Sequence, residues 1–197
     1  MPYSDDKERL SLIMKQEHHK ENYLPLPHSI SWDKYFMLQA MIASFKSKDP
    51  STKVGCIIVD AHHHQISMGY NGMVAGIDES KIPWGKDLSS PLIHQKYGYV
   101  VHSEANAILH ASKPLEGATL YVTLFPCNEC AKMVASTKIA EVVYLSDKHS
   151  CAEHTQIAKK IFELSGVKFR KLDISENLLS DLNQHLTFQQ KEASLPS

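Results

Sequence analysis

The sequence lacks the features of a membrane or secreted protein. No apolar run approaches the ~18 residues of a membrane-spanning helix. The first residues, MPYSDDKERLSL, are acidic where a secretory signal has a basic region. We therefore expect a cytoplasmic protein that has no membrane partner.

A surplus of charge of either sign is also missing. The 197 residues include 21 basic and 22 acidic side chains, whereas proteins that coat nucleic acid usually carry a large positive excess. This balance argues against a stable nucleic-acid partner, although a local basic patch can still hold one phosphate.

Cysteine is scarce, with four residues in the chain: Cys56, Cys127, Cys130 and Cys151. Thiols in a cytosolic protein of this size stay reduced, so disulfides are not expected. A C-x-x-C pair, formed here by Cys127 and Cys130, then indicates metal or redox chemistry.

The length fits one ordinary domain with extensions at both ends, since domains mostly contain ~100 to 200 residues. Residues 1–28 are charged with scattered apolar side chains and predict an N-terminal helical extension, which contains Pro25 and Pro27 near its end. We place the main domain at 29–173, and a C-terminal helix with a polar tail at 174–197.

Hydrophobic periodicity predicts alternating strands and helices in the main domain. The run after Ser31 carries apolar residues at helical spacing, Tyr35, Leu38, Ile42 and Phe45, and indicates the first core helix. This alternation predicts βα units and a sheet covered by helices on both faces. Strands are expected at 54–60, 65–70, 119–124, 142–145 and 167–172, further helices at 101–111, 127–138 and 153–165, and a long loop at 71–100.

Two of these helices begin with residues that can bind a metal. His102 and Glu104 open one helix, Cys127 and Cys130 open the next, and a strand lies between them. Two thiolates and one imidazole are suitable zinc ligands, and three protein ligands leave the fourth tetrahedral position for water. A carboxylate beside that position, Glu104, can take a proton from water and pass it to a ring nitrogen and then to leaving ammonia.

The alternative is a structural zinc site, which needs a fourth protein ligand such as Cys56, His94, His110 or Cys151. That interpretation leaves Glu104 without a role, so the residues favour a catalytic site. A second, structural zinc is not expected either, because Cys56 lies inside an apolar strand and is interpreted as a small core residue.

The pattern H-x-E…P-C-x-x-C is the signature of zinc-dependent nucleobase deaminases. Around it, longer segments resemble deoxycytidylate deaminases over roughly residues 32–172: KDPSTKVGCIIVD, GYNGM, PW, HSEANAI, LYVTLFPCNECAK and YLSDK. The resemblance implies a cytidine-deaminase fold, a three-layer α/β/α arrangement with a mixed five-stranded sheet. It also implies hydrolysis of deoxycytidine monophosphate (dCMP) to deoxyuridine monophosphate (dUMP) and ammonia, which supplies dUMP for thymidylate synthesis.

The resemblance assigns roles residue by residue. His102, Cys127 and Cys130 match the zinc ligands of the family, and Glu104 matches the proton shuttle. Asn71 matches an asparagine that holds a sugar hydroxyl in related deaminases. Asn-Gly is also a common turn dipeptide, so Asn71 has a purely structural alternative.

Other positions depart from the family. The backbone N–H groups of Ser103 and Glu104 would bind the base carbonyl, and family members commonly have alanine where this chain has Ser103. The loop after Ser146 is shorter than expected and lacks a tyrosine. Lys148 and His149 in that loop are the candidates for binding the monophosphate, although a loop lysine is more often only solvated.

The resemblance further implies one catalytic Zn²⁺ per chain and a homo-oligomer, usually a hexamer. It also implies feedback control by dCTP and dTTP, with Mg²⁺ accompanying the bound triphosphate. The GYNGM segment and the loop through Pro83 and Trp84 correspond to the part of regulated relatives that contributes to the triphosphate site.

Different functions share the same signature. It occurs in deaminases of cytidine, of dCTP, of tRNA adenosine and of the riboflavin pathway, and the near-neutral charge argues against tRNA. A catalytically silent binding subunit is a further alternative, which the complete ligand set and Glu104 oppose. An accessory role in DNA uptake finds no support in a basic DNA-binding stretch.

Overall fold

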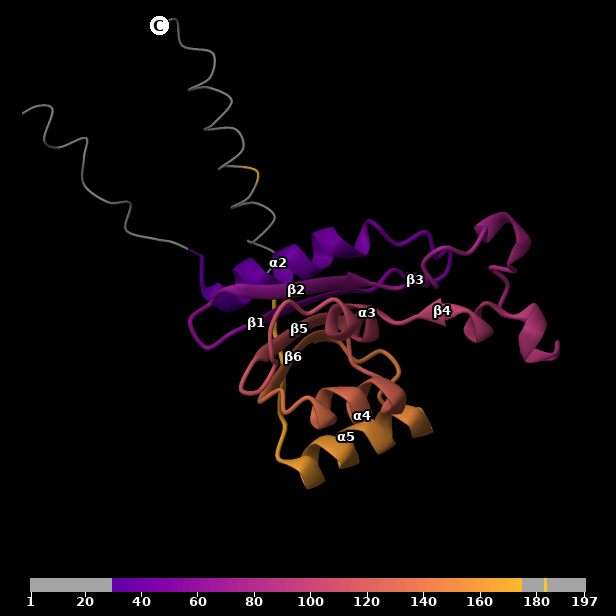
Figure 1. Cartoon of the computed structure of the whole chain (residues 1–197). Coiled ribbons are helices and arrows are strands. Elements are labelled where there is room, and N and C mark those ends of the chain that lie inside the picture. Colours follow the sequence, from indigo (N-terminus) through magenta and orange to yellow (C-terminus); the bar gives the residue numbers. More distant parts are fainter. Residues whose placement is uncertain (1–29, 175–182, 184–197) are drawn as a thin grey trace, which may run out of the picture. The chain divides into compact units, whose positions relative to one another are not determined.

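The computed structural model describes residues 30–174 and residue 183 (Figure 1). The predicted N-terminal extension, 1–28, and the C-terminal segment beyond residue 174, apart from Asn183, lie outside the described residues. No helix in the described part of the chain is both long and apolar enough to span a bilayer.

A mixed five-stranded sheet forms the centre of the domain, in the strand order β2-β1-β5-β6-β7. The central strands β1 and β5 are antiparallel, and β1 also pairs with β2 as a hairpin. The β5, β6 and β7 strands are parallel, which confirms the predicted βα units. The strands are β1 Gly55–Val59, β2 Gln65–Tyr70, β5 Thr119–Leu124, β6 Glu141–Ser146 and β7 Lys168–Lys171.

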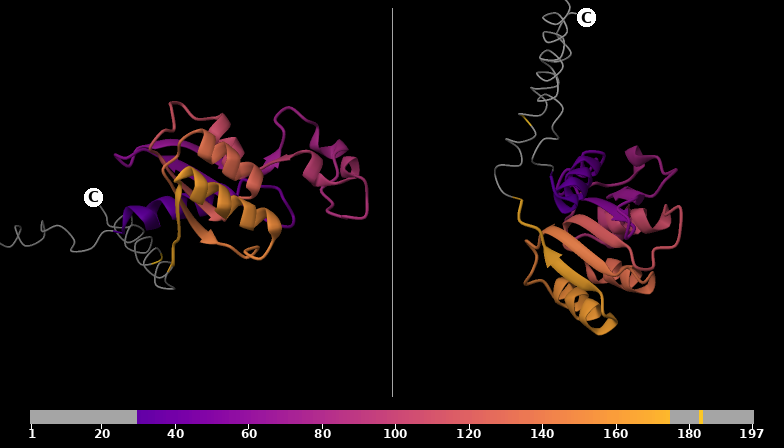
Figure 2. Two further views of the ribbon diagram at one scale, coloured as in Figure 1. Left: turned by 90° about the horizontal axis from the view of Figure 1, so that it is seen from below. Right: turned by 90° about the vertical axis from the view of Figure 1, so that its left-hand side faces the viewer.

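Helices cover both faces of this sheet, as Figures 1 and 2 show. One face packs against α2 through a cluster that includes Phe36, Ile57 and Tyr121. The other face packs against the remaining helices through a second cluster that includes Leu120 and Phe162. The three-layer α/β/α prediction is therefore confirmed. The helices are α2 Trp32–Ser44, α3 Ser103–Leu109, α4 Asn128–Ser136 and α5 Glu153–Ser165.

The predicted first helix is confirmed, but the face that it buries is different from the predicted one. The sequence predicts a core stripe of Tyr35, Leu38, Ile42 and Phe45. In the structure, Ile42 is 64% and Phe45 75% exposed, whereas Phe36 and Ala40 are buried. The reason is close packing, because a Cβ at Gly55 of β1 would lie 1.9 Å from the Ala40 carbonyl oxygen. The face that carries alanines allows this approach, and the bulkier stripe does not.

The long segment after β2 is closed by a short ribbon. β3 (Gly72–Met73) pairs antiparallel with β4 (Val100–Val101), so both ends of the segment lie together. Between them the chain forms three short 3₁₀ helices: η1 Glu79–Lys81, η2 Leu92–His94 and η3 Lys96–Gly98.

Close packing against β2 also places the start of α3. A Cβ at Gly69 would lie 2.1 Å from the Ser103 carbonyl oxygen and 2.6 Å from the Ala107 nitrogen, so only glycine lets α3 approach the strand. The Asn106 side chain donates a hydrogen bond of 2.8 Å to the Tyr70 carbonyl oxygen. These contacts hold the first turn of α3 at the end of the sheet.

Candidate active site and metal centre

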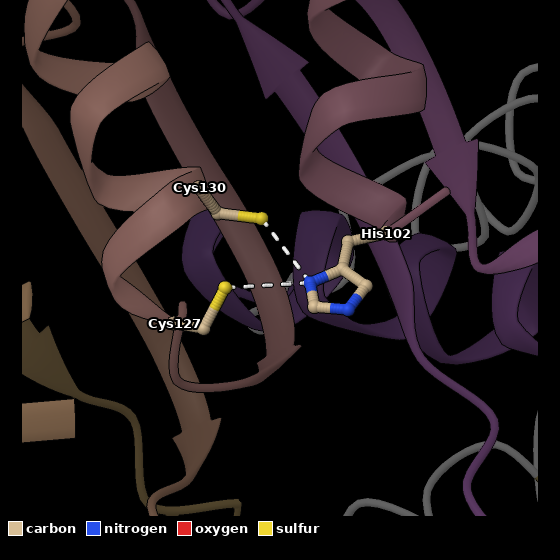
Figure 3. A group of neighbouring side chains, drawn as sticks. All are labelled: His102, Cys127 and Cys130. Atoms are coloured by element: carbon tan, nitrogen blue, oxygen red, sulfur yellow. Dashed lines mark hydrogen bonds between the residues drawn. The ribbon is translucent and has the colours of Figure 1, made fainter. Parts of the chain in front are cut away.

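Two helix starts meet at the end of the sheet and bring three predicted ligands together (Figure 3). His102 is the N-cap residue of α3, and Cys127 is the N-cap residue of α4, three positions after the end of β5. Cys130 lies in the first turn of α4 and is buried, whereas His102 is exposed towards the pocket described below. Among the described residues, these three form the group of histidine, cysteine and acidic side chains that can hold a metal ion.

The geometry of this group fits zinc. The Nδ1 atom of His102 lies 3.4 Å from the Sγ atom of Cys127 and 3.4 Å from that of Cys130. Tetrahedral zinc with bonds of ~2.3 Å to sulfur and ~2.0 Å to nitrogen places such ligand atoms about 3.5 Å apart. The donor set, two sulfurs and one imidazole, also matches the preference of zinc.

The ligands polarise one another. The hydrogen bond with Cys130 lowers the pKa of Cys127 to about 3, so this side chain is a thiolate at neutral pH. The hydrogen bond between His102 and Cys127 raises the pKa of His102 to about 9. The hydrogen bond between Cys130 and Cys127, together with burial, raises the pKa of the Cys130 thiol far above its ordinary value. Because metal ligands bind in their deprotonated forms, zinc binding releases protons from the group.

Glu104 lies beside the ligand group and is almost completely buried. Glu104 is 4% exposed, and this burial raises the pKa of its carboxyl above the ordinary value. The charge of His102, the backbone N–H of Glu104 itself and the hydroxyl of Ser103 oppose this shift. The Ser103 Oγ donates a hydrogen bond of 2.8 Å to the Glu104 Oε2. A raised pKa suits a group that must both accept and donate protons near neutral pH.

A pocket of about 490 Å³ opens over this group. The ligands His102 and Cys127 and the carboxylate of Glu104 line one part of it. The remaining wall comes from the turn after α2, the long segment before α3, the end of β5, and the loop and first turn around the start of α5. These other lining residues include Asp49, Ser51, Thr52, Val54, Asn71, Lys86, Lys96, Tyr97, Lys148, His149, His154 and Thr155.

The predicted substrate-binding residues all line this pocket. Asn71 is 7% exposed at the end of β2, and Ser103 is fully buried beside Glu104. Lys148 and His149 lie exposed in the loop between β6 and α5. The Nζ atom of Lys148 lies 3.4 Å from the Thr52 Oγ1 across the pocket.

Several lining residues have no counterpart in the sequence prediction. Asp49 and Lys96 form a buried ion pair in the pocket wall, and His154 of α5 places its ring 6.4 Å from that of His149. Asp49 lies in the KDP segment that carries part of the resemblance, so a signal existed there. The spacing of Lys96 and His154 contains no comparable signal.

Comparison with known proteins relates this chain to one family. A family model for the cytidine and deoxycytidylate deaminase zinc-binding region matches residues 30–146. A deoxycytidylate deaminase from Mus musculus is 43% identical over 143 residues, which make up 72% of this chain and 80% of the mouse protein. The ComE operon protein 2 of Bacillus subtilis (strain 168) is 32% identical over 162 residues, or 79% of this chain and 78% of that protein.

Solved structures show the same fold. The crystal structure of a dCMP deaminase from the cyanophage S-TIM5 in complex with dCMP and dUMP superposes with a TM-score of 0.59 at 23% identity. The superposition covers 74% of this chain and 100% of the phage protein. The family match runs from the residues before α2 to the end of β6 and includes the three ligands and Glu104.

Proposed function

Because this chain belongs to the cytidine and deoxycytidylate deaminase family, we propose that it hydrolyses dCMP to dUMP and ammonia. The observation that carries this proposal is the group of His102, Cys127 and Cys130 beside the buried carboxylate of Glu104. The identity of 43% to a deoxycytidylate deaminase supports dCMP as the substrate.

The residues of the site have separate roles in the proposed reaction. His102, Cys127 and Cys130 would hold zinc, which acts as a Lewis acid and lowers the pKa of water to about 7. The water oxygen adds to the carbon that carries the amino group, while Glu104 takes one proton from the water and delivers it to the adjacent ring nitrogen. Glu104 then takes the second proton from the new hydroxyl and transfers it to the amino group. The C–N bond breaks, ammonia leaves, and the hydroxyl oxygen becomes the carbonyl oxygen of dUMP.

The first turn of α3 orients the base. In that turn the backbone N–H groups have no acceptor within the helix. The N–H of Ser103 is available to a ligand, and the N–H of Glu104, which contacts its own carboxylate, would exchange that contact for the ligand. We assign the N–H groups of Ser103 and Glu104 to the carbonyl oxygen of the base. The partial positive charge of a helix start favours the oxygen of a polarised carbonyl. Asn71, deeper in the wall, is assigned to a hydroxyl of the sugar.

The test of this function is a panel of substrates. Zinc-replete protein is incubated separately with dCMP, CMP, dCTP, deoxycytidine and cytidine, and the uracil products and ammonia are measured by chromatography. Selective conversion of dCMP supports the proposal. Preferred turnover of another compound would retain the deaminase chemistry and refute the substrate. Inactivity towards every compound with zinc bound would refute the activity.

The phosphate is assigned to Lys148 and His149, because both line the pocket and carry or can carry positive charge. Replacement of Lys148 with alanine should raise the KM for dCMP about tenfold, the effect of losing one charge-assisted hydrogen bond, and should leave kcat nearly unchanged. Steady-state kinetics measure both constants. Deoxycytidine, which lacks the phosphate, is the control, and its KM should not change. An unchanged KM for dCMP would refute the role of Lys148.

We also propose that the chain acts in the cytoplasm as a homo-hexamer controlled by dCTP and dTTP, with Mg²⁺ at the triphosphate. The resemblance of the GYNGM segment and of the loop around Pro83 supports this regulation. The apolar side chains of Tyr35 and Ile42 on α2 and of Phe45 directly after it are exposed and form a surface that an assembly can cover. Light scattering that shows a monomer would refute the hexamer. Hyperbolic kinetics that neither triphosphate changes would refute the control.

A further inference from the structure

A buried ion pair lies in the pocket wall, and the proposed reaction does not use it. The Nζ atom of Lys96 lies 2.6 Å and 2.8 Å from the two carboxylate oxygens of Asp49. The side chain of Lys96 is 6% exposed and that of Asp49 is 2% exposed. Burying two charges carries a desolvation cost that their attraction often fails to offset, so such a pair is weak evidence for stability alone. Its position in the pocket suggests another role.

The carboxylate of Asp49 holds three separate parts of the wall. Oδ1 accepts hydrogen bonds from the backbone N–H groups of Ser51 at 2.7 Å and Thr52 at 3.2 Å. Oδ2 accepts a hydrogen bond of 3.2 Å from the Asn71 side-chain amide. Lys96 joins the same carboxylate from the long segment that precedes α3. Burial raises the pKa of Asp49, but the hydrogen bonds from Lys96, Ser51 and Thr52 outweigh it and hold the pKa below the ordinary value.

These contacts fix the orientation of the Asn71 amide. Its Nδ2 donates one hydrogen to Asp49 and the other, at 3.0 Å, to the Thr52 carbonyl oxygen. Its Oδ1 accepts a hydrogen bond of 2.8 Å from the backbone N–H of Val54. An ionised carboxylate accepts hydrogen bonds and cannot donate them. If the Asn71 amide rotated by 180°, its oxygen would face the Asp49 carboxylate, and two acceptors would be in contact.

The consequence is a restricted hydrogen-bonding capacity at Asn71. Both amide hydrogens are used, whereas the carbonyl oxygen has two lone pairs and one described partner. Within the pocket, Asn71 can therefore accept one further hydrogen bond and cannot donate one. A ligand group that matches it is a hydroxyl that acts as donor.

We propose that Asp49 is a positioning residue for nucleotide recognition, which holds the Asn71 amide so that Oδ1 is presented to a sugar hydroxyl while Lys96 neutralises the buried charge. This inference rests on the proposed nucleotide substrate. The side-chain partners of Asp49 are Ser51, Thr52, Asn71 and Lys96, none of which belongs to the metal-ligand group, so its effect is expected on substrate recognition and not on the chemical step. Because dCMP carries a 3′-hydroxyl and no 2′-hydroxyl, the 3′-hydroxyl is the partner of Asn71.

The test separates orientation from charge balance with three variants: Asp49→Asn, Lys96→Met and the double variant that carries both. In Asp49→Asn, the new NH₂ group must face one of the hydrogen-bond donors that previously bonded to the carboxylate. The ammonium of Lys96 also loses its counter-ion. The Tm should fall by roughly 10 °C when either partner alone is changed, and most of this loss should be recovered in the double variant. The KM for dCMP should instead depend on residue 49 alone. It should rise about tenfold in both variants that carry the Asp49→Asn substitution.

The substrate analogue 2′,3′-dideoxycytidine monophosphate (ddCMP) tests the hydroxyl directly. Wild-type protein should prefer dCMP over ddCMP about tenfold in kcat/KM, because the analogue leaves the Asn71 oxygen without its donor. The double variant should discriminate clearly less than the wild type, because the amide loses its contact with Asp49 and keeps only those with Thr52 and Val54. A purely structural role of Asp49 would not remove this selectivity.

Asp60 provides a matched control for the removal of a carboxylate. Its oxygens accept hydrogen bonds from the backbone N–H groups of His62 and His64, each at 2.9 Å, and from Lys113 at 2.6 Å. Asp60 thus holds a loop and a lysine as Asp49 does, but it does not line the pocket. Asp60→Asn should leave the preference for dCMP over ddCMP unchanged.

The outcomes are distinguishable. Wild-type protein that does not convert dCMP would refute the proposed function, and this inference with it. Wild-type protein that converts dCMP and ddCMP equally well would refute the inference alone, whether or not the variants fold. A double variant that recovers its Tm and retains the wild-type KM and selectivity would also refute it, whereas loss of selectivity with recovered Tm would support it.

Discussion

Replacement of Glu104 with glutamine should lower kcat for dCMP by roughly 10³- to 10⁴-fold, the upper part of the range for general acid–base catalysis. Glutamine has nearly the same shape but neither accepts nor releases a proton at neutral pH. The carboxylate is expected to carry every proton transfer of the reaction, so no other described side chain at the ligand group replaces it. Single-turnover measurements of dUMP formation determine the rate of the chemical step.

The control for this variant is a glutamate on the neighbouring helix. Glu129 lies in the first turn of α4, is exposed, and pairs with Lys132 at 2.6 Å. Glu129→Gln should retain wild-type kcat, and both variants should retain zinc. A Glu104→Gln variant that binds zinc and keeps more than about a tenth of wild-type kcat would contradict the assignment of Glu104 as proton shuttle.

Replacement of Cys130 with alanine should abolish both zinc binding and activity. Cys130 is buried in the first turn of α4, and its replacement would leave only His102 and Cys127 to hold zinc. Loss of a residue that only supports a ligand weakens metal binding ~10- to 100-fold, so loss of the ligand itself should exceed that range. Metal analysis of the dialysed protein should give about one zinc per wild-type chain and less than about a tenth of that for the variant.

Cys151 is the matched control for the loss of a thiol, because it is exposed and outside the ligand group. Cys151→Ala should retain zinc and activity. A Cys130→Ala protein that stays folded and keeps one zinc would contradict the ligand assignment. Two zinc ions per wild-type chain would contradict the expectation of a single metal site.

Local sequence patterns predicted the elements of the fold well. The strand at 119–124 and the helix at 153–165 begin and end in the structure where periodicity places them. The two strands predicted at 54–60 and 65–70 are β1 and β2, which pair as a hairpin across a short polar loop. The type and bounds of such elements depend on residues that are close together in the sequence, so one sequence is enough to predict them.

The same local patterns failed where packing chose between two possibilities. Both stripes of α2 are apolar, and periodicity favoured the one with the larger side chains. The structure buries Phe36 and Ala40 instead, because the Gly55 backbone lies directly against the helix. Periodicity within α2 does not predict this contact, because it depends on how α2 packs against β1 in the tertiary structure.

The residue types of the metal centre were determined by the sequence itself. One residue separates His102 from Glu104, and two separate Cys127 from Cys130, so each pair shares one helix start wherever the helix lies. Only the tertiary structure decided which groups form the rest of the pocket. Asp49 and Lys96 are 47 positions apart, and Asn71 joins them from a third segment. Contacts of this kind arise from the order of strands in the sheet and the close packing of helices against it. The spacing of neighbouring residues in the sequence predicts neither of these.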